Sequence, residues 1–332
     1  VARGLLRAVG ADASGALWPL DRARSRAFGV TDEAVGALYG AELGWLAGTI
    51  AIPAGERHKT LASAERVWSG LVRAGVDRGD HLVALGGGVV GDLAGFCAAT
   101  YQRGIPIVQV PTTLVAQVDS AYGGKTGVDL PQAKNYVGAY HQPAGVVVDP
   151  GTLESLPAAE LAAGWVEVLK TALIAGGELW ERVSSGADLD DWTILACART
   201  KLGVVAADER DAGRRQVLNL GHTVGHAIET ATGYERYRHG EAVGLGLLAA
   251  LRLSGAEELR ARVGALLEER GLPTVLDGAT VERVVEATAR DKKRIGEKLP
   301  FVLLERPGEP LTGCEVAPAD LRAAVSELEG RG

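Results

Sequence analysis

Short apolar runs alternate with amphipathic stretches along the first half of the chain. The stretches 60–74 and 89–100 repeat apolar residues at helical spacing, whereas the runs between such stretches are compact and read as strands. Strands that alternate with helices are typical of a parallel sheet covered by helices on both faces. The predicted strands are 26–32, 48–55, 81–88, 105–113 and 144–150.

The pattern changes after Asp149, where helical periodicity takes over. In this second half only residues 298–305 (KLPFVLLE) read as extended, and residues 1–25 predict no element. We therefore predict an α/β domain over 1–152 and a mostly α-helical domain over 153–332. The predicted helices are 158–174, 193–207, 219–231, 240–254, 256–270 and 279–290.

Composition narrows the class of protein. A chain of 332 residues is right for about two domains, and 47% hydrophobic with 23% charged residues is ordinary for a soluble globular protein. We expect no membrane span and no signal peptide. The net charge of −7 argues against a nucleic-acid surface. Three scattered cysteines, Cys97, Cys197 and Cys314, suit reduced thiols and predict a cytoplasmic protein.

Lysine is scarce in this chain. Only eight of the 35 lysine and arginine residues are lysine. A lysine is a compact charge whose pKa shifts readily, so these few are candidates for chemistry. The alternative is that they are ordinary surface residues. They are Lys59, Lys125, Lys134, Lys170, Lys201, Lys292, Lys293 and Lys298.

A glycine-rich turn, GGGVVGD (86–92), follows a predicted strand and opens a predicted helix. Its spacing fits G-x-G-x-x-G, in which backbone N–H groups approach a pyrophosphate. The match is imperfect, because no acidic residue follows about 20 positions later, and a tight turn without a ligand is the alternative. Glu56 and Lys59 in PAGERHK and Asp32 at the end of the first strand extend the candidate nucleotide site.

The segment VPTTLVAQVDSAYGGKTGVD (110–129) is also dense in polar groups. Thr112 and Thr113 end a strand, and Asp119 precedes Gly-Gly-Lys125. A phosphate-binding P-loop would need glycine at position 119, so that interpretation fails. The turn still suits an anionic oxygen, and Lys134 and Asn135 follow it.

Half of the six histidines fall within 18 residues. In LNLGHTVGHAIE (218–229), His222 and His226 are four apart and share a helical face, and His239 follows in RHGEA. Two imidazoles and a carboxylate make a catalytic zinc site, and Glu167, one helical turn before Lys170, is a candidate oxygen ligand. The alternative for any single histidine is a packed core residue.

With these motifs in view, the chain resembles the 3-dehydroquinate synthase family of the sugar-phosphate cyclase superfamily. The resemblance runs from about residue 26 to 305 and rests on GGGVVGDLAGFCAATYQRG, QVPTTLVAQVDSAYGGKTGVD, KNYVGAYHQP, VEVLK, ADERDAGRRQVLNLGHTVGHAIE, HGEAV and RDKK. It implies a Rossmann-like NAD-binding domain and an α-helical domain that binds metal and substrate. It also implies a cytoplasmic homodimer in the shikimate pathway of aromatic amino-acid biosynthesis.

The resemblance implies a lyase that uses NAD and one divalent metal, zinc or cobalt. The substrate would be the sugar phosphate 3-deoxy-D-arabino-heptulosonate 7-phosphate, and the products 3-dehydroquinate and phosphate. The implied steps are transient oxidation by NAD, β-elimination of phosphate, re-reduction and intramolecular aldol closure. The implied metal ligands are Glu167, His222 and His239.

The remaining implied site residues divide between cofactor and substrate. Those for NAD are Asp32, Glu56, Lys59, Gly87, Gly88, Val89, Val90, Gly91, Asp92, Thr112, Thr113, Asp119, Lys125, Lys134, Thr152 and Ser155. Those for substrate and catalysis are Arg103, Lys125, Asn135, Lys170, Lys201, Arg215, Asn219, His226 and one of Lys292 and Lys293.

The chain departs from the family in three places, and rivals stay open. Residues 1–25 lack the usual opening strand, Tyr136 stands where methionine is common, and FVLLERPGE near the C-terminus is only loosely similar to the family. The amino-dehydroquinate synthases share these motifs, whereas cyclases for 2-deoxy-scyllo-inosose and sedoheptulose 7-phosphate usually alter the helix motif that Asn219, His222 and His226 keep. A metal-dependent polyol dehydrogenase is the second alternative, and a non-enzymatic binding protein is the third.

Overall fold

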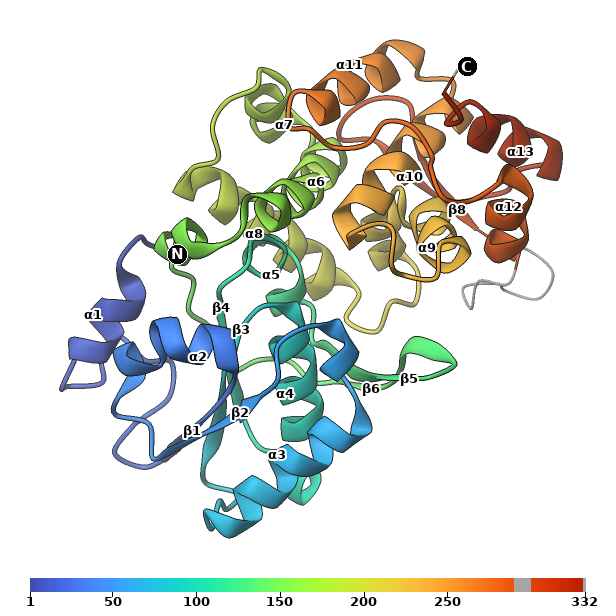
Figure 1. The fold of residues 1–332 in the computed structure, drawn as a ribbon. Helices are drawn as coiled ribbons and strands as arrows, with labels where there is room; N and C mark the ends of the chain where they lie inside the picture. The colour runs from blue at the N-terminus through green and yellow to red at the C-terminus, as the bar shows by residue number, and fades with distance from the viewer. Residues whose placement is uncertain (290–299, 331–332) are drawn as a thin grey trace. The chain divides into compact units, whose positions relative to one another are not determined.

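The computed structural model describes residues 1–289 and 300–330 (Figure 1). The chain forms two compact units, Val1–Leu156 and Pro157–Gly332. The 3₁₀ helix η5 (Pro150–Ser155) closes the first unit and contains residue 152, the boundary taken from the sequence. Lys292, Lys293 and Lys298 lie outside the described residues.

The first unit is built on a five-stranded parallel sheet with the strand order β2-β1-β3-β4-β7. Each strand overlaps one of the predicted apolar runs, and the central strand β3 is buried along its whole length. A parallel strand that is buried on both faces has no polar side to show, which explains its continuous apolar sequence. The strands are β1 (Ala27–Asp32), β2 (Gly48–Ile52), β3 (His81–Gly86), β4 (Ile107–Pro111) and β7 (Gly145–Val146).

Helices cover both faces of this sheet. Leu82 and Ala84 of β3 pack in a core with helices α3 and α4, whereas Val83 and Leu85 pack in a second core on the other face. Helix α1 brings Leu6 and Val9 to that second core, so the opening residues form an element that the sequence did not predict. The helices of this unit are α1 (Leu5–Ala11), α2 (Glu33–Tyr39), α3 (Leu61–Arg73), α4 (Gly88–Thr100) and α5 (Leu114–Val118).

The order of the sheet reverses beside β1, which pairs with β2 on one side and β3 on the other. In open α/β sheets, ligands bind outside the carboxyl ends of the strands at such a point. The carboxyl ends of β1, β3 and β4 lead into Asp32, Gly86 and Thr112. The polar residues that the sequence assigned to a nucleotide therefore follow strands at one edge of this sheet.

A buried histidine lies at the opposite edge, where β3 begins. His81 accepts a hydrogen bond from Trp18 Nε1 at 2.9 Å, and its Nδ1 lies 2.7 Å from Ser25 Oγ. The side chain is inaccessible to solvent. Burial lowers the pKa of His81 to about 4, against the opposing effect of Asp80. The imidazole is therefore neutral in the folded protein near pH 7.

We expect this histidine to make the free energy of unfolding depend on pH. In the unfolded chain the imidazole takes up a proton near pH 6.5, whereas the folded one does so only near pH 4. Stability is therefore full above pH 6.5 and falls as pH drops towards 4, by an amount on the order of 3 kcal/mol. Urea titrations across this range should give a flatter profile for His81→Gln, and equal slopes for both proteins would contradict the assignment.

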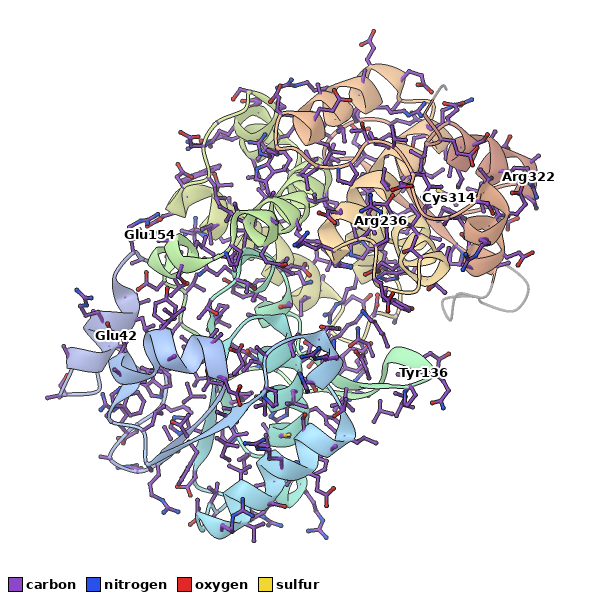
Figure 2. The ribbon with its side chains drawn as sticks, viewed as in Figure 1. Glu42, Tyr136, Glu154, Arg236, Cys314 and Arg322 are labelled. Atoms are coloured by element: carbon purple, nitrogen blue, oxygen red, sulfur yellow. The ribbon has the colours of Figure 1, made fainter. Side chains whose placement is uncertain are left out.

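Two antiparallel strands, β5 (Lys125–Leu130) and β6 (Ala133–Tyr140), follow the Gly-Gly turn. The sequence did not predict this hairpin, because the apolar residues of β6 do not alternate with polar ones and half of its positions are exposed. Tyr136 lies near the turn of the hairpin with 61% of its surface exposed (Figure 2). The hairpin carries Lys125, Lys134 and Asn135, to which the resemblance assigns cofactor or substrate contacts.

The second unit is mostly helical, as predicted, and it confirms the fold class. Helix α10 lies at its centre, with a continuous run of buried residues from Ala242 to Leu251. The prediction of a single extended segment was incomplete, because β8 (Phe301–Leu304) pairs with a second strand, β9 (Pro310–Cys314). None of the helices in the described ranges has both the length and the apolar character to span a membrane. The helices are α6 (Ala158–Ala175), α7 (Gly177–Ser184), α8 (Asp191–Ala207), α9 (His222–Ala231), α10 (His239–Leu253), α11 (Glu257–Glu268), α12 (Val281–Ala289) and α13 (Pro318–Ser326).

Candidate functional site

A buried carboxylate lies at the centre of the candidate site in the second unit. Glu167 is in the middle of α6 and is 1% exposed. The ammonium of Lys170, one turn later and equally buried, lies 2.5 Å from Glu167 Oε2. Burial alone raises the pKa of Glu167, but Lys170 and two nearby imidazoles lower it well below its ordinary value. The group is therefore an ionised carboxylate in the interior of a helical unit.

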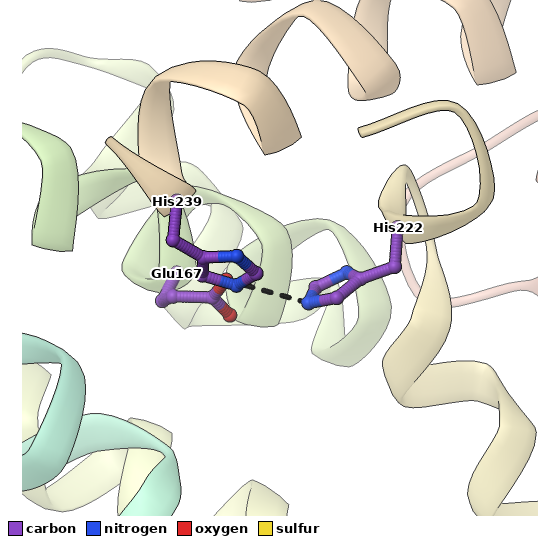
Figure 3. Close-up of side chains that lie close together, drawn as sticks. All are labelled: Glu167, His222 and His239. Carbon is purple, nitrogen blue, oxygen red and sulfur yellow. Dashed lines mark ion pairs between the residues drawn. The ribbon is translucent and has the colours of Figure 1, made fainter. Parts of the chain in front are cut away.

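The two imidazoles belong to His222 and His239, the first residues of α9 and α10. Their Nε2 atoms lie 3.6 Å and 3.5 Å from Glu167 Oε1. Figure 3 shows the three side chains converging from three helices. The ligand atoms of this set all lie within 4.8 Å of one another. Residues far apart in the sequence thus meet at one point, as the resemblance implied for a metal site.

The donor set fits a divalent metal. Both oxygens of Glu167 are buried, and neither has an aligned hydrogen-bond donor in the described part of the chain. A buried acceptor without a donor is costly unless a cation or another donor satisfies it. Two imidazole nitrogens and one carboxylate oxygen are the protein ligands of many catalytic zinc sites, which keep further positions open.

The other ring nitrogens of both histidines have partners of their own. His222 Nδ1 lies 3.2 Å from the carbonyl oxygen of Leu220, and His239 Nδ1 lies 3.4 Å from Glu229 Oε1. Burial by itself lowers the pKa of His239, but the carboxylates of Glu167 and Glu229 on either side of the ring raise it to about 10. An Nδ1–H that donates to an oxygen leaves the Nε2 lone pair free to ligate. Both Nδ1 atoms therefore face oxygens that can accept their hydrogens, and a bound metal would displace the proton that the raised pKa places on His239 Nε2.

Glycines bring the three helices close enough for these contacts. An added Cβ at Gly240 would lie 1.8 Å from the carbonyl oxygen of Ala163 on α6. An added Cβ at Gly246 would lie 1.9 Å from the carbonyl oxygen of Gly221, directly before α9. Backbone thus packs directly against backbone on both sides of α10. This explains why glycine adjoins both His222 and His239 in the sequence.

His226 lies on the same side of α9 as His222 but belongs to a different set of candidate ligands. Its ring centroid is 5.3 Å from that of His222 and 5.9 Å from that of His239. Its ligand atoms group with Glu229 and His239, whereas Glu167 groups with His222 and His239. The structure thus places His226 beside the proposed metal ligands without making it one of the set around Glu167.

Three further expected substrate residues of this unit are partly or fully buried. Lys201 lies on α8, and Arg215 and Asn219 lie on the 3₁₀ helix η6 (Arg214–Asn219) that leads towards α9. Arg215 Nη1 donates to the carbonyl oxygen of Glu209 at 2.7 Å, which fixes the guanidinium. Lys292 and Lys293 cannot be placed, since they lie outside the described residues.

The glycine-rich turn of the first unit opens helix α4. Added Cβ atoms at Gly87 and Gly91 would lie 2.7 Å from a Thr113 methyl and 2.8 Å from Gln109 Oε1, so the turn packs closely on its neighbours. In the described residues no side chain caps this helix, so its first N–H groups can meet an anion. A small pocket lined by Gly87, Asp92 and Lys125, with other residues, adjoins the turn.

Lys59 is the centre of a buried charge network beside this turn. Its Nζ donates to Asn135 Oδ1 at 2.8 Å and lies 3.1 Å from Glu56 and 3.3 Å from Asp92. Burial alone lowers the pKa of Lys59, but these two carboxylates and Asp129 raise it. Burial also raises the pKa of Asp92 to about 6. The network joins two segments that were assigned to the cofactor, around Lys59 and Asp92, with Asn135, which was assigned to the substrate.

Several predicted cofactor residues already have structural partners. Asp32 caps α2 by accepting from Val35 N at 2.8 Å, and Thr113 caps α5. Thr152 Oγ1 donates to the Asp149 carbonyl, and Ser155 Oγ bonds to Tyr39. Thr112 differs, because its Oγ1 is buried without a partner in the part of the chain that is described. A role of these residues toward NAD stays a prediction, as does that of Val89, Val90 and Asp119.

One predicted residue lies away from the rest of its unit's candidate site. Arg103 is exposed and follows α4, whereas the glycine-rich turn precedes that helix. A 13-residue helix is about 20 Å long, so Arg103 and Gly87 lie at opposite ends of it. The first unit therefore does not bring Arg103 to the nucleotide turn.

Comparison with known proteins identifies the family. Profiles described as 3-dehydroquinate synthase N-terminal and 3-dehydroquinate synthase C-terminal match residues 49–163 and 164–294. The 3-dehydroquinate synthase of Symbiobacterium thermophilum is 47% identical over 326 residues, which cover 91% of this chain and 90% of that protein. The chain belongs to the 3-dehydroquinate synthase family. The resemblance seen in the sequence motifs is thereby confirmed.

Other relatives agree with membership of the 3-dehydroquinate synthase family. That of Halorhodospira halophila is 46% identical over 318 residues, covering 91% of this chain and 90% of the relative. The solved 2-epi-5-epi-valiolone synthase from Streptomyces hygroscopicus is 26% identical with a TM-score of 0.85, covering 99% of this chain and 95% of that one. Its structure contains NAD⁺ and Zn²⁺.

Two residues of this family member escaped the sequence-based prediction. Asp129 accepts from the Asn135 backbone N–H at 2.7 Å, but it lies on the hairpin that was not predicted. Glu229 contacts His239, and its position in the sequence is unusual enough to have drawn attention to it. It is an acidic residue among buried apolar ones in the last turn of α9, three residues after His226. A carboxylate in that position is unfavourable for both burial and the helix dipole.

Proposed function

We propose that this chain converts 3-deoxy-D-arabino-heptulosonate 7-phosphate into 3-dehydroquinate and inorganic phosphate. The observation that carries the proposal is the meeting of Glu167, His222 and His239, with Lys170 against the carboxylate. The 3-dehydroquinate synthase of Symbiobacterium thermophilum is 47% identical over about nine tenths of both proteins, and this supports the substrate of that family over the substrates of more distant cyclases.

We assign NAD to the first unit and one divalent metal, zinc or cobalt, to the second. When bound, NAD supplies a reversible hydride acceptor and the metal supplies a Lewis acid. Glu167, His222 and His239 would hold the metal. The residues that would hold NAD are the helix turn from Gly87 to Asp92 with Asp32, Glu56, Lys59, Thr112, Thr113, Asp119, Lys125, Lys134, Thr152 and Ser155.

The side chains of this chain would bind and orient a phosphorylated substrate. Lys201 and Arg215 offer fixed positive charges that can donate charge-assisted hydrogen bonds to phosphate or carboxylate oxygens. Lys125, Asn135 and Asn219 are further donors. His226 can exchange a proton near the metal ligands without being one of them. Lys170 neutralises Glu167 and fixes the position of its carboxylate.

The rival functions differ in what they require. A polyol dehydrogenase performs net oxidation and does not need phosphate-directed cations such as Lys201 and Arg215. A 2-epi-5-epi-valiolone synthase is only 26% identical to this chain. An amino-dehydroquinate synthase uses the same motifs, and substrate competition decides between the two. We further propose a cytoplasmic homodimer, as in the family resemblance; three free cysteines suit a reducing compartment.

We expect phosphate release from the heptulosonate substrate without net accumulation of NADH. The cyclase returns its hydride in every turnover, so absorbance at the nicotinamide band, about 340 nm, should stay flat while phosphate rises. Glu167→Ala should abolish release, whereas Glu235→Gln, an exposed acid in the same unit, should not change it. NADH formed in step with product would indicate a dehydrogenase, and release from the amino substrate alone would indicate the amino analogue.

A further inference from the structure

The carboxylate of Glu229 is the feature of the second unit that the metal ligands do not explain. It lies in the last turn of α9 and is 8% exposed. The C-terminal end of a helix carries partial negative charge, so a buried anion there is doubly unfavourable. Because both burial and the helix dipole disfavour the Glu229 carboxylate, it needs a compensating partner.

The partner of this carboxylate is His239. Glu229 Oε1 lies 3.4 Å from His239 Nδ1, while Glu167 Oε1 lies 3.5 Å from Nε2 of the same ring. One imidazole thus lies between two carboxylates from two helices, α9 and α6. The ring needs such support, because the side chain of His239 keeps 40% of its surface exposed, against 11% for His222.

We propose that Glu229 is a positioning residue that holds His239 in the tautomer and orientation required of a metal ligand. The inference rests on the proposed metal site and adds the group that completes it. An imidazole that carries its proton on Nε2 cannot ligate through that atom, so the Nδ1–H must be kept where it is. Glu229 accepts that hydrogen, as the Leu220 carbonyl does for His222.

The alternative for Glu229 is a direct metal ligand. Ligand atoms of His226, Glu229 and His239 also lie within 4.8 Å of one another, so this set could hold an ion by itself. Glu167 argues for the positioning role, because its Oε1, which faces both imidazoles, is buried without an aligned donor in the described residues, while Oε2 is paired with Lys170. Glu229 faces His239 Nδ1, so the unsatisfied acceptor lies on the Glu167 side of the ring.

The test measures metal binding by the full chain, apart from its activity. Zinc affinity by chelator competition should fall about 10- to 100-fold in Glu229→Ala. Glu229→Gln keeps a carbonyl that can accept from Nδ1–H, so it should lose less affinity than the alanine variant. The visible spectrum of the cobalt-loaded chain should change in Glu229→Ala, because the orientation of one ligand is altered. Glu235→Gln, an exposed acid in the following loop, is the matched control and should bind as the parent does.

Three results overturn the proposal or its basis, and each has a distinct signature. Unchanged affinity and an unchanged cobalt spectrum in Glu229→Ala would remove Glu229 from the site. Two ions in the parent, of which one is lost in Glu229→Ala, would make it a ligand and not a positioning residue. Unchanged affinity in Glu167→Ala would instead remove the proposed metal site. Circular dichroism of each variant checks whether the helices are intact.

Discussion

His222→Ala is expected to lose the metal and phosphate release together, whereas His226→Ala is expected to keep the metal and slow turnover on the order of 10²-fold or more. The two histidines lie one helical turn apart, but only His222 groups with Glu167 and His239. Its Nε2 is 3.6 Å from Glu167 Oε1, and its Nδ1 faces the Leu220 carbonyl. Without that ring two protein ligands remain, and the affinity should collapse.

The loss of His226 leaves this set of three ligands complete. The ring centroid of His226 lies 5.3 Å from that of His222, so His226 is close enough to exchange a proton with a molecule that the metal would hold. Metal content by elemental analysis and phosphate release are measured on both variants, with His58→Ala from the first unit as the control. If His226→Ala loses the metal and His222→Ala keeps it, the two roles are reversed. If neither loses it, the metal lies elsewhere.

Gly240→Ala is expected to damage the same site without touching a ligand. The new methyl group would lie 1.8 Å from the carbonyl oxygen of Ala163, and backbone cannot give way as a flexible side chain can. Helix α10 must move away from α6, and His239, the neighbouring residue, moves with it away from Glu167. We expect a loss of about 3 kcal/mol or more in the free energy of unfolding and a parallel loss of metal.

Gly264→Ala is the matched control. Gly264 lies within helix α11, and in the described structure the nearest atom to an added Cβ there is 3.9 Å away. Alanine in an exposed or open helical position should stabilise by about 0.5–1 kcal/mol, which is the opposite sign. Urea unfolding and metal stoichiometry on both variants give the comparison. Equal stability of Gly240→Ala and the parent would show that the helix contact is not needed.

The sequence predicted helices and strands best where an element is buried on one face or along its whole length. The apolar run of β3 and the helical period of α6 are strong signals, because long buried segments admit few polar residues. The β5–β6 hairpin escaped because its second strand is half exposed, so no alternation of apolar and polar positions marks it. Helix α1 escaped because it is short and only two of its residues, Leu6 and Val9, are fully buried.

The residues that meet at the candidate site could be picked out from the sequence, but the choice of His222 over His226 came from the family resemblance, and the groups that support them could not be predicted. His222 and His239 stand out as rare residues in a dense motif, and Glu167 with Lys170 shows a helical pair. The contact between Glu229 and His239 depends on the path of the chain from α9 to α10, which no local pattern fixes. The roles of Gly240 and Gly246 likewise need the crossing of two helices, because a glycine in a helix has no periodic signature.

The origin of the ligands on α6, α9 and α10 makes the proposed metal a non-covalent crosslink. An ion held by Glu167, His222 and His239 closes a loop of the chain from residue 167 to 239, and it must be released when these helices separate. The resistance of the second unit to unfolding then rises with the logarithm of free metal concentration, by about 1.4 kcal/mol for each tenfold excess over the dissociation constant. Scarcity of metal would therefore lower the amount of folded enzyme in the cell as well as the activity of each molecule.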